Sequence, residues 1–368
     1  MKLLFISRFI PYLGGREIIV QSILHGLAKN HQVYLLTPDK GYFTRDFTIY
    51  NFQHPKEIPK LINKIRPDIV NIHTFYLAKP ALLISQKLNI PVVLTLHGLF
   101  LDYYGKKYQK FFEFIKGHLK NPNFFISVVC EHHKKQLENF GISPNKIYVI
   151  KNGIDPKKFT YIENLSKKTL RKNLYLSQSN KIILTVARLT PLKGLNYLIK
   201  AISLLKFKKF ILLISVPMGR YNKDEMDYRD YLLKCAERWG CRDKIIIQFH
   251  DHESVPLLYK SCDLFILPSI IEGIPLSVLE AMICGLLTIA SDTGGISEII
   301  KNGENGFLIQ PQNYKNIAPV VDKSLNLGRI KKKRIIQDAQ KTIAKNFLEK
   351  RMISQYENYF LNIKNKLL

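Results

Sequence analysis

The sequence predicts an α/β protein made of two doubly wound domains. Short apolar runs alternate with helical patterns from the first residue onward, as βα units require. At 368 residues the chain is too long for one ordinary hydrophobic core. A polar segment rich in Lys, Asn and Ser at residues 155–178 separates two series of apolar runs. We therefore expect two Rossmann-like domains that face a cleft.

The first series predicts an N-terminal domain over residues 1–160. Residues 2–7 form the first predicted strand, and a loop with Gly14 and Gly15 follows it. A helix is predicted over 17–30, because its apolar side chains recur at helical spacing. Further strands are predicted at residues 32–36, 69–72, 92–96, 124–128 and 146–150.

The second series predicts a C-terminal domain over residues 161–345. Its strands are predicted at residues 181–186, 210–215, 244–248, 263–267 and 287–290. We expect residues 346–368 to form a C-terminal helix that returns to the N-terminal domain. The sequence has no G-x-G-x-x-G after a strand and no G-x-x-x-x-G-K-[ST], so neither dinucleotide binding nor P-loop hydrolysis has support.

Composition limits the partners and the compartment. Lys and Arg number 56 against 29 Asp and Glu, and the net charge of +27 favours nucleic acid, acidic lipid headgroups or phosphorylated substrates without choosing among them. Five cysteines without a Cys-x-x-Cys pair are typical of reduced thiols in the cytoplasm. No apolar stretch reaches the roughly 18 residues that span a bilayer. We expect a cytoplasmic protein that is at most peripheral on the inner membrane face.

Glu272 and Glu280 flank the start of an apolar helix that follows a predicted strand. Eight helical residues would rise about 12 Å, whereas the carboxyl pair of a retaining glycosidase is only about 5–5.5 Å apart. Pro275 suits the first helical turn, which places Glu272 in the entry loop and Glu280 inside the helix. The two carboxylates then contact different parts of one ligand, such as a ribose diol and a sugar hydroxyl. The alternative is equally open: Glu272 is an acid before the helix that the helix dipole favours, and Glu280 is an exposed acid within the helix.

Arg188 and Lys193 lie in the loop between the strand at 181–186 and a helix predicted over 195–204. A guanidinium fork and a compact ammonium together can neutralise a diphosphate leaving group. Two ordinary surface cations are the alternative.

In combination, these motifs resemble the family 4 glycosyltransferases of the GT-B fold, over nearly the whole chain. The order and separation of the motifs make the resemblance specific. The motifs are the glycine loop of residues 8–15, Asn152-Gly-Ile-Asp155, the pair Arg188 and Lys193, the pair Glu272 and Glu280, Thr293-Gly-Gly-Ile-Ser-Glu298 and Asn302-Gly-Glu-Asn-Gly-Phe307.

The resemblance implies a retaining hexosyltransferase that uses a nucleotide-diphosphate sugar as co-substrate, with no other cofactor and no metal. The C-terminal domain would bind the donor, and a glycan or lipid-linked acceptor would enter from the N-terminal domain. Negative charge builds on the diphosphate as the glycosidic bond breaks. Arg188 and Lys193, helped by the helix start at Leu276 and Ser277, would stabilise that charge.

The resemblance also assigns the remaining donor contacts. Glu280 would hold the ribose hydroxyls and Glu272 the donor sugar. Gly14 and Gly15 would let backbone N–H groups approach the donor phosphate. His97, at the end of the strand at 92–96, would donate or accept a hydrogen bond at a hydroxyl of the transferred sugar.

Acceptor contacts are predicted from position alone. His73 follows the strand at 69–72 and is as consistent with the acceptor site as with a structural role. Lys106 and Lys107 lie in a segment at 101–116 that interleaves aromatic residues with lysines. Such a segment suits a lipid-diphosphate or glycan acceptor, or an anionic membrane surface, and equally an amphipathic helix packed on its own domain.

Two functions of other classes stay open: a nucleic-acid-binding protein, which we do not expect, and a catalytically idle sugar-binding relative. Nucleic-acid binding predicts a steep loss of affinity with salt. The stretches at 216–219 and 250–252 depart from the family pattern, and in the family the second of them commonly borders the nucleobase. The nucleobase and the donor sugar are therefore not predicted.

Overall fold

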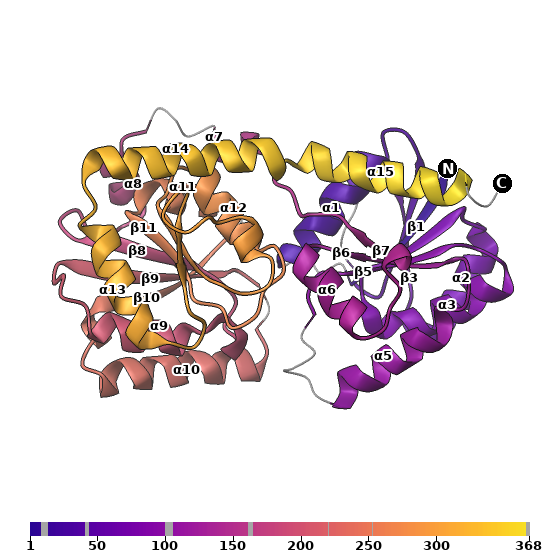
Figure 1. Cartoon of the computed structure of the whole chain (residues 1–368), viewed down its shortest axis with the longest axis horizontal. Coiled ribbons are helices and arrows are strands. Elements are labelled where there is room, and N and C mark those ends of the chain that lie inside the picture. Colours follow the sequence, from indigo (N-terminus) through magenta and orange to yellow (C-terminus); the bar gives the residue numbers. More distant parts are fainter. Residues whose placement is uncertain are drawn as a thin grey trace. The chain divides into compact units, whose positions relative to one another are not determined.

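The computed structural model describes residues 1–8, 14–40, 44–99, 106–160, 165–219, 221–251 and 253–365 (Figure 1). Its tertiary contacts divide the chain into two compact units. Unit 1 comprises Met1–Asn152 and Glu349–Leu368, and unit 2 comprises Gly153–Leu348. The chain thus divides after residues 152 and 348, whereas the predicted domain boundaries lie after residues 160 and 345.

Unit 1 contains a seven-stranded sheet in the order β3-β2-β1-β4-β5-β6-β7, with every neighbouring pair parallel. Its strands are β1 Lys2–Ile6, β2 Gln32–Thr37, β3 Thr48–Asn51, β4 Ile69–Ile72, β5 Val92–Leu96, β6 Phe124–Val128 and β7 Ile147–Val149. Its helices are α1 Gly15–Leu27, α2 Ile58–Ile65, α3 Ala78–Lys87, α5 Lys106–His118, α6 Glu131–Asn139 and α15 Glu349–Asn365.

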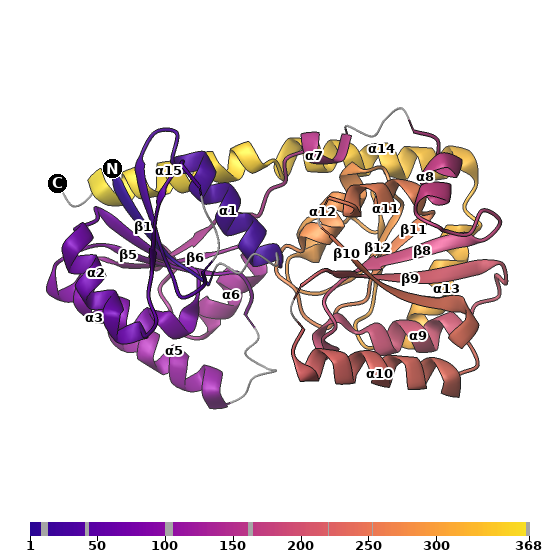
Figure 2. The ribbon, with the colours of Figure 1, turned by 180° about the vertical axis from the view of Figure 1, so that it is seen from behind.

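Helices cover both faces of this sheet (Figures 1 and 2). Side chains of α2, α3, α5 and α6 share one hydrophobic core with the strands. The C-terminal helix α15 lies beside α1, where Gly26 leaves the room that Ile353 needs: a Cβ on Gly26 would lie 2.4 Å from Ile353 Cδ1. Phe360 of α15 also packs edge-on against Phe5 of β1. The last helix is thus built into the core of unit 1.

Unit 2 contains a six-stranded parallel sheet in the order β10-β9-β8-β11-β12-β13. Its strands are β8 Lys181–Val186, β9 Phe210–Pro217, β10 Ile245–His250, β11 Leu264–Leu267, β12 Thr288–Ser291 and β13 Phe307–Ile309. Its helices are α7 Lys157–Thr160, α8 Lys167–Asn173, α9 Leu195–Ser203, α10 Lys223–Arg238, α11 Val255–Ser261, α12 Leu276–Ile283, α13 Tyr314–Leu325 and α14 Arg329–Asn346. Helix α9 packs with α10 and α13 on one face, while α8, α11, α12 and α14 cover the other (Figure 1).

The predicted fold class, two doubly wound parallel sheets with helices on both faces, is confirmed. The strands β4, β5, β6 and β8 coincide with their predicted ranges. Strands β3 and β13 were not predicted. Among the described residues, no helix combines the length and the apolar character that a membrane crossing requires.

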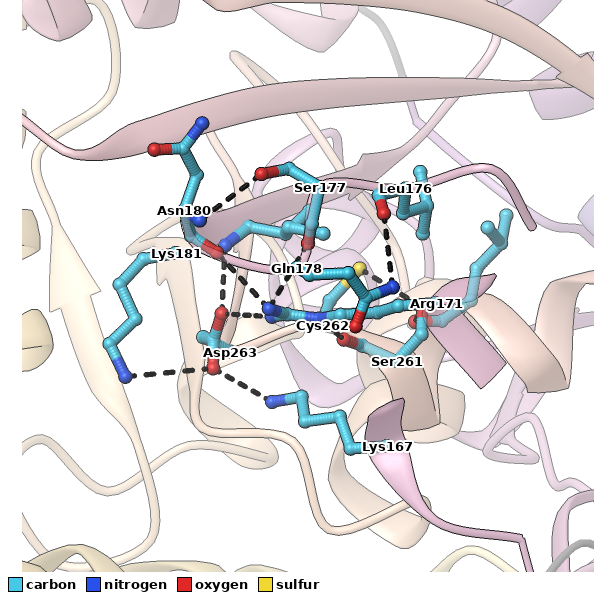
Figure 3. Close-up of polar contacts among 12 residues, drawn as sticks. Lys167, Arg171, Leu176, Ser177, Gln178, Asn180, Lys181, Ser261, Cys262 and Asp263 are labelled. Carbon is cyan, nitrogen blue, oxygen red and sulfur yellow. Dashed lines mark hydrogen bonds and ion pairs between the residues drawn. The ribbon is translucent and has the colours of Figure 1, made fainter. Parts of the chain in front are cut away.

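Asp263, which directly precedes β11, ties helix α8 to the sheet of unit 2 (Figure 3). Arg171 donates to one of its carboxylate oxygens at 2.5 Å, and Lys167 donates to the other at 2.8 Å. The Ile182 N–H also donates to this carboxylate, at 2.8 Å. Burial by itself raises the pKa of Asp263, but the hydrogen bonds from Lys167 and Ile182 and the charges of Lys167 and Arg171 outweigh burial and hold that pKa below its ordinary value.

Replacing Asp263 by Asn should destabilise unit 2 by about 3 kcal/mol near neutral pH, because the buried Arg171 loses its counter-charge. A carboxylate with a lowered folded-state pKa stabilises the fold above its unfolded pKa, and this contribution fades as pH falls through the folded pKa. The difference between D263N and wild type should therefore shrink toward about pH 3 in urea unfolding followed by circular dichroism.

Asp338→Asn is the matched control. In the part of the chain that the structure describes, the Asp338 carboxylate pairs only with exposed side chains of Arg334 and Lys341, so its loss should cost less than about 1 kcal/mol. Equal effects of the two substitutions at neutral pH would contradict the role given to Asp263.

Candidate functional site

The candidate site of unit 2 lies where the order of its strands reverses. Strand β8 lies between β9, which follows it in the sequence, and β11. The loops that leave the carboxyl ends of β8 and β11 therefore emerge side by side. In open parallel sheets this is the position at which ligands bind.

Two glycines allow three loops to meet here by direct backbone contact. Gly194, at φ 63°, ends the loop after β8, and a Cβ on it would lie 2.1 Å from the Pro268 carbonyl oxygen. Gly294, at φ 57°, lies in the loop after β12, and its Cβ would lie 1.8 Å from the Glu272 carbonyl oxygen. Both positions combine a left-handed conformation with a contact that excludes any side chain. The loops after β8, β11 and β12 are thereby locked together around Glu272.

Glu272 is held through one carboxylate oxygen. Lys193 Nζ donates to Glu272 Oε1 at 2.5 Å, and Ser269 Oγ donates to the same oxygen at 2.6 Å. Within the described part of the chain, Oε2 of Glu272 has no hydrogen bond. The Glu272 side chain is 10% exposed and that of Lys193 is 20% exposed, so an anchored carboxylate offers one free oxygen at the end of β11.

Arg188, the other predicted cation, lies two residues after the end of β8 and is exposed. Its guanidinium has no hydrogen bond or ion pair with any residue that the structure describes. The structure therefore pairs Lys193 with Glu272 and leaves Arg188 available to an anion.

Helix α12 begins immediately after this loop. Pro275 is its N-cap, one position earlier than predicted, and the helix opens with Leu276 and Ser277. Their N–H groups donate to no acceptor among the described residues and mark the positive end of the helix. The prediction that Glu272 lies in the entry loop and Glu280 inside the helix is confirmed.

Glu280 is also held through one oxygen and is nearly inaccessible, with 5% of the residue exposed. The Tyr259 hydroxyl donates to its Oε2 at 2.9 Å. Burial raises the pKa of Glu280 to about 7, against the opposing effects of the Tyr259 hydrogen bond and the Lys158 charge. Oε1 of Glu280 accepts no hydrogen bond from the described residues. Glu280 thus repeats the arrangement of Glu272.

At the start of α1 in unit 1, Gly14 is the N-cap and Gly15 is the first helical residue. The Glu17 carboxylate lies over this helix end: a Cβ on Gly14 would be 2.7 Å from Glu17 Oε2. Arg16 donates to Glu17 Oε1 at 3.0 Å. Residues 9–13 of the glycine loop lie outside the described residues, and the predicted approach of phosphate to Gly14 and Gly15 stays a prediction.

His97 and His73 meet at the carboxyl ends of β5 and β4. Their rings are joined by a hydrogen bond of 2.8 Å between His73 Nδ1 and His97 Nε2. His73 is only 4% exposed, and its other nitrogen bonds to Asn71 Oδ1 at 2.7 Å. Both ring nitrogens of His73 thus have partners within unit 1, as its structural role predicts, and its contact with the acceptor stays a prediction. The side chains of Lys106 and Lys107 lie outside the described residues.

Three residues that support the site were not predicted: Ser269, Tyr259 and Asn71. Asn71 could have been found, because it is the one polar residue in a four-residue apolar strand. Tyr259 lies 21 residues before Glu280 on another helix, and no local pattern connects them. Among the described residues, no group of three His, Cys, Asp or Glu side chains is arranged to hold a metal ion. The predicted independence from metal stays a prediction.

Two family models match the chain. The model described as glycosyltransferase family 4 matches residues 13–158, and the model described as glycosyl transferases group 1 matches residues 166–342. An uncharacterized glycosyltransferase of Methanocaldococcus jannaschii is 27% identical, over 89% of each chain. The N,N'-diacetylbacillosaminyl-diphospho-undecaprenol alpha-1,3-N-acetylgalactosaminyltransferase of Campylobacter jejuni is 31% identical, over 64% of this chain and 60% of its own. The UDP-Gal:alpha-D-GlcNAc-diphosphoundecaprenol alpha-1,3-galactosyltransferase of Escherichia coli is 28% identical, over 73% and 70%.

Solved structures share the fold over almost the entire chain. Anabaena HepE in complex with UDP-glucose has a TM-score of 0.86 at 20% identity, covering 98% of this chain and 100% of its own. A glycosyltransferase from Rickettsia africae has a TM-score of 0.82 at 23% identity, covering 98% of each chain. At these identities the likeness establishes the fold, and the predicted GT-B fold is confirmed.

Glu280→Gln should stabilise the protein at alkaline pH. Between an unfolded pKa near 4.5 and a folded pKa of about 7, the folded state binds more protons than the unfolded state, so the free energy of unfolding falls as pH rises. Glutamine does not ionise and avoids this cost, which amounts to about 3 kcal/mol by linkage. Urea unfolding should show E280Q more stable than wild type near pH 8 and equally stable near pH 4. A difference in the free energy of unfolding that stays constant from pH 4 to pH 8 would contradict the raised pKa of Glu280.

Proposed function

From the premise that the chain belongs to the family 4 glycosyltransferases, as its two family matches over residues 13–158 and 166–342 show, we propose that it transfers a hexosyl group with retention of configuration. The donor is a nucleotide-diphosphate sugar bound by unit 2. The acceptor is a hydroxyl group of a glycan or of a lipid-linked sugar.

The observation that carries this proposal is that Glu272 and Glu280 form the same kind of contacts. Each has one oxygen anchored by protein donors, Ser269 and Lys193 for Glu272 and Tyr259 for Glu280, and one oxygen without a partner in the described part of the chain. An anchored carboxylate with a free oxygen accepts hydrogen bonds from hydroxyl groups in a fixed direction. The ribose hydroxyls for Glu280 and the sugar hydroxyls for Glu272 suit these two positions.

The charges beside Glu272 suit the diphosphate. Lys193 and Arg188 lie in the loop that follows β8. The start of α12, after the loop that follows β11, presents the N–H groups of Leu276 and Ser277. A doubly charged diphosphate can take Lys193 as its partner without leaving Glu272 bare, since Ser269 still donates to that carboxylate. These groups stabilise the charge that develops as the donor bond breaks.

The reaction breaks the bond between the anomeric carbon and the diphosphate oxygen and forms a bond from that carbon to the acceptor oxygen on the same face. The hydroxyl proton of the acceptor leaves with the diphosphate, so the products are a nucleoside diphosphate and the new glycoside. His97 of unit 1 makes a hydrogen bond with a hydroxyl of the transferred sugar. None of these steps needs a cofactor beyond the nucleotide sugar.

The acceptor class is supported by the relatives. The names of the proteins from C. jejuni and E. coli specify sugars carried on diphospho-undecaprenol. We propose an acceptor of the same kind, a sugar linked to a polyprenyl diphosphate. The net charge of +27 favours both this anionic lipid and an anionic membrane surface on the cytoplasmic side.

A thermal-shift screen against UDP-, GDP- and ADP-sugars tests the proposal. A donor that binds the folded state raises the melting temperature by mass action. One nucleotide sugar should stabilise the protein more than its free nucleotide diphosphate does. If no member of the panel raises the melting temperature, the donor site is wrongly assigned.

Lys193→Ala should lower kcat/KM for the donor found in the screen by about 10²–10³-fold, the effect of losing one charge-stabilising group. Lys209→Ala is the matched control, because Lys209 is an exposed lysine of unit 2 that directly precedes β9, at the opposite end of the sheet. Release of the nucleoside diphosphate measures both variants. Undiminished turnover in K193A, or an equal loss in K209A, would remove the role given to Lys193.

A further inference from the structure

A chain of buried polar groups reaches His97 from the interior of the unit 1 sheet. Asn71 of β4 is paired in register with Val93 of β5. His73 follows β4 and His97 follows β5, so the three polar side chains lie along two neighbouring strand ends. Asn71 and His73 are 1% and 4% exposed.

The direction of the hydrogen bonds is fixed at the Val93 carbonyl, which can only accept. Asn71 Nδ2 therefore faces it, at 3.0 Å, and also donates to Thr95 Oγ1 at 2.8 Å. The opposite orientation of the amide would set two carbonyl oxygens against each other. Asn71 Oδ1 consequently points to His73 as an acceptor.

That acceptor determines where the proton of His73 lies. His73 Nε2 is 2.7 Å from Asn71 Oδ1 and must carry the proton. Burial, with the charges of His97 and Arg16, lowers the pKa of His73 well below its ordinary value, so the ring is neutral and Nδ1 is a bare acceptor. Phe5 stacks on the ring, and Tyr356 of α15 lies against it, which holds the ring plane.

The same reasoning continues to His97. Its Nε2 lies 2.8 Å from the bare Nδ1 of His73 and must donate. Burial, with the charge of Arg16, lowers the pKa of His97 to about 3, so His97 is neutral as well. Its proton is therefore on Nε2, and its Nδ1 is a lone-pair acceptor. That atom is buried and has no hydrogen-bond partner among the described residues.

We propose that His73 and Asn71 are positioning residues that hold His97 in its Nε2–H tautomer, so that His97 presents Nδ1 only as a hydrogen-bond acceptor. A hydroxyl of the transferred sugar, which donates, is the matching ligand. In this state His97 cannot protonate a leaving group. The ligand rests on the proposed function, whereas the tautomer concerns the free protein.

The tautomer can be measured directly in the ligand-free, full-length protein. Two-bond ¹H–¹⁵N correlation spectra at about pH 7 distinguish the protonated from the bare nitrogen of each imidazole. His73→Asn and His97→Asn assign the two rings. We expect both rings neutral with the proton on Nε2. A proton on Nδ1 of His97, or an imidazolium at either ring, would overturn the proposal without reference to any variant's activity.

Asn71→Asp should reverse the direction of the hydrogen bond between His73 and His97. A carboxylate beside His73 Nε2–H favours the imidazolium, whose Nδ1–H then donates to His97 and displaces the His97 proton to Nδ1. His97 would change from acceptor to donor. We expect the inverted His97 signals together with a fall of about 10–100-fold in kcat for donor cleavage and a nearly constant donor KM. Inverted signals with unchanged kcat would contradict the positioning role.

Asn123→Asp is the matched control. Asn123 is a buried amide of the same sheet that donates to Asn89 Oδ1 at 2.7 Å, just before the start of β6 and far along the strands from His97. It should leave the His97 tautomer and kcat unchanged. If the nucleotide-sugar screen fails while the spectra show the Nε2–H tautomer, the proposed function fails and the tautomer assignment stands.

Discussion

The candidate site of unit 2 depends on backbone contact between three loops. Ile270 N–H donates to the Leu192 carbonyl at 2.8 Å, and Gly295 N–H donates to the Gly273 carbonyl at 3.0 Å. Gly194 and Gly294 make these approaches sterically allowed. Because the loops are joined by backbone hydrogen bonds, the backbone segments that carry Lys193 and Glu272 are fixed relative to each other. Such pre-organisation is what electrostatic stabilisation of a leaving group requires.

Two buried carboxylates of unit 2 differ in the donors that surround them. Asp263 is surrounded by cations and an N–H donor, its pKa is lowered, and it stabilises the fold. Among the described residues Glu280 has a single hydroxyl donor; its pKa is raised to about 7, and it costs stability when ionised. A buried carboxylate with few hydrogen-bond donors destabilises the folded state, so folding alone does not explain it. In the proposed function, the ribose hydroxyls of the nucleotide sugar supply the missing donors.

The sequence predicted the elements whose pattern is local. Buried parallel strands are continuous apolar runs, so β4, β5, β6 and β8 were found at their observed limits. Strand β3 is short and partly exposed, and β13 has only three residues at the sheet edge, so neither carries such a run. Glu272 and Glu280 were placed correctly relative to the helix because Pro275 marks its start. Tyr259, Ser269 and the burial of His73 depend on contacts between distant segments, which no local pattern encodes.

In the proposed function, the two glutamates hold different parts of one donor. Calorimetric titration of wild type, E272Q and E280Q with the stabilising nucleotide sugar and with its free nucleoside diphosphate tests this division of roles. E280Q should weaken both ligands alike, by about tenfold or more for a lost charged hydrogen bond. E272Q should weaken the nucleotide sugar more than the free nucleotide, because only the sugar contacts it. Equal losses for both ligands in both variants would contradict the division of roles.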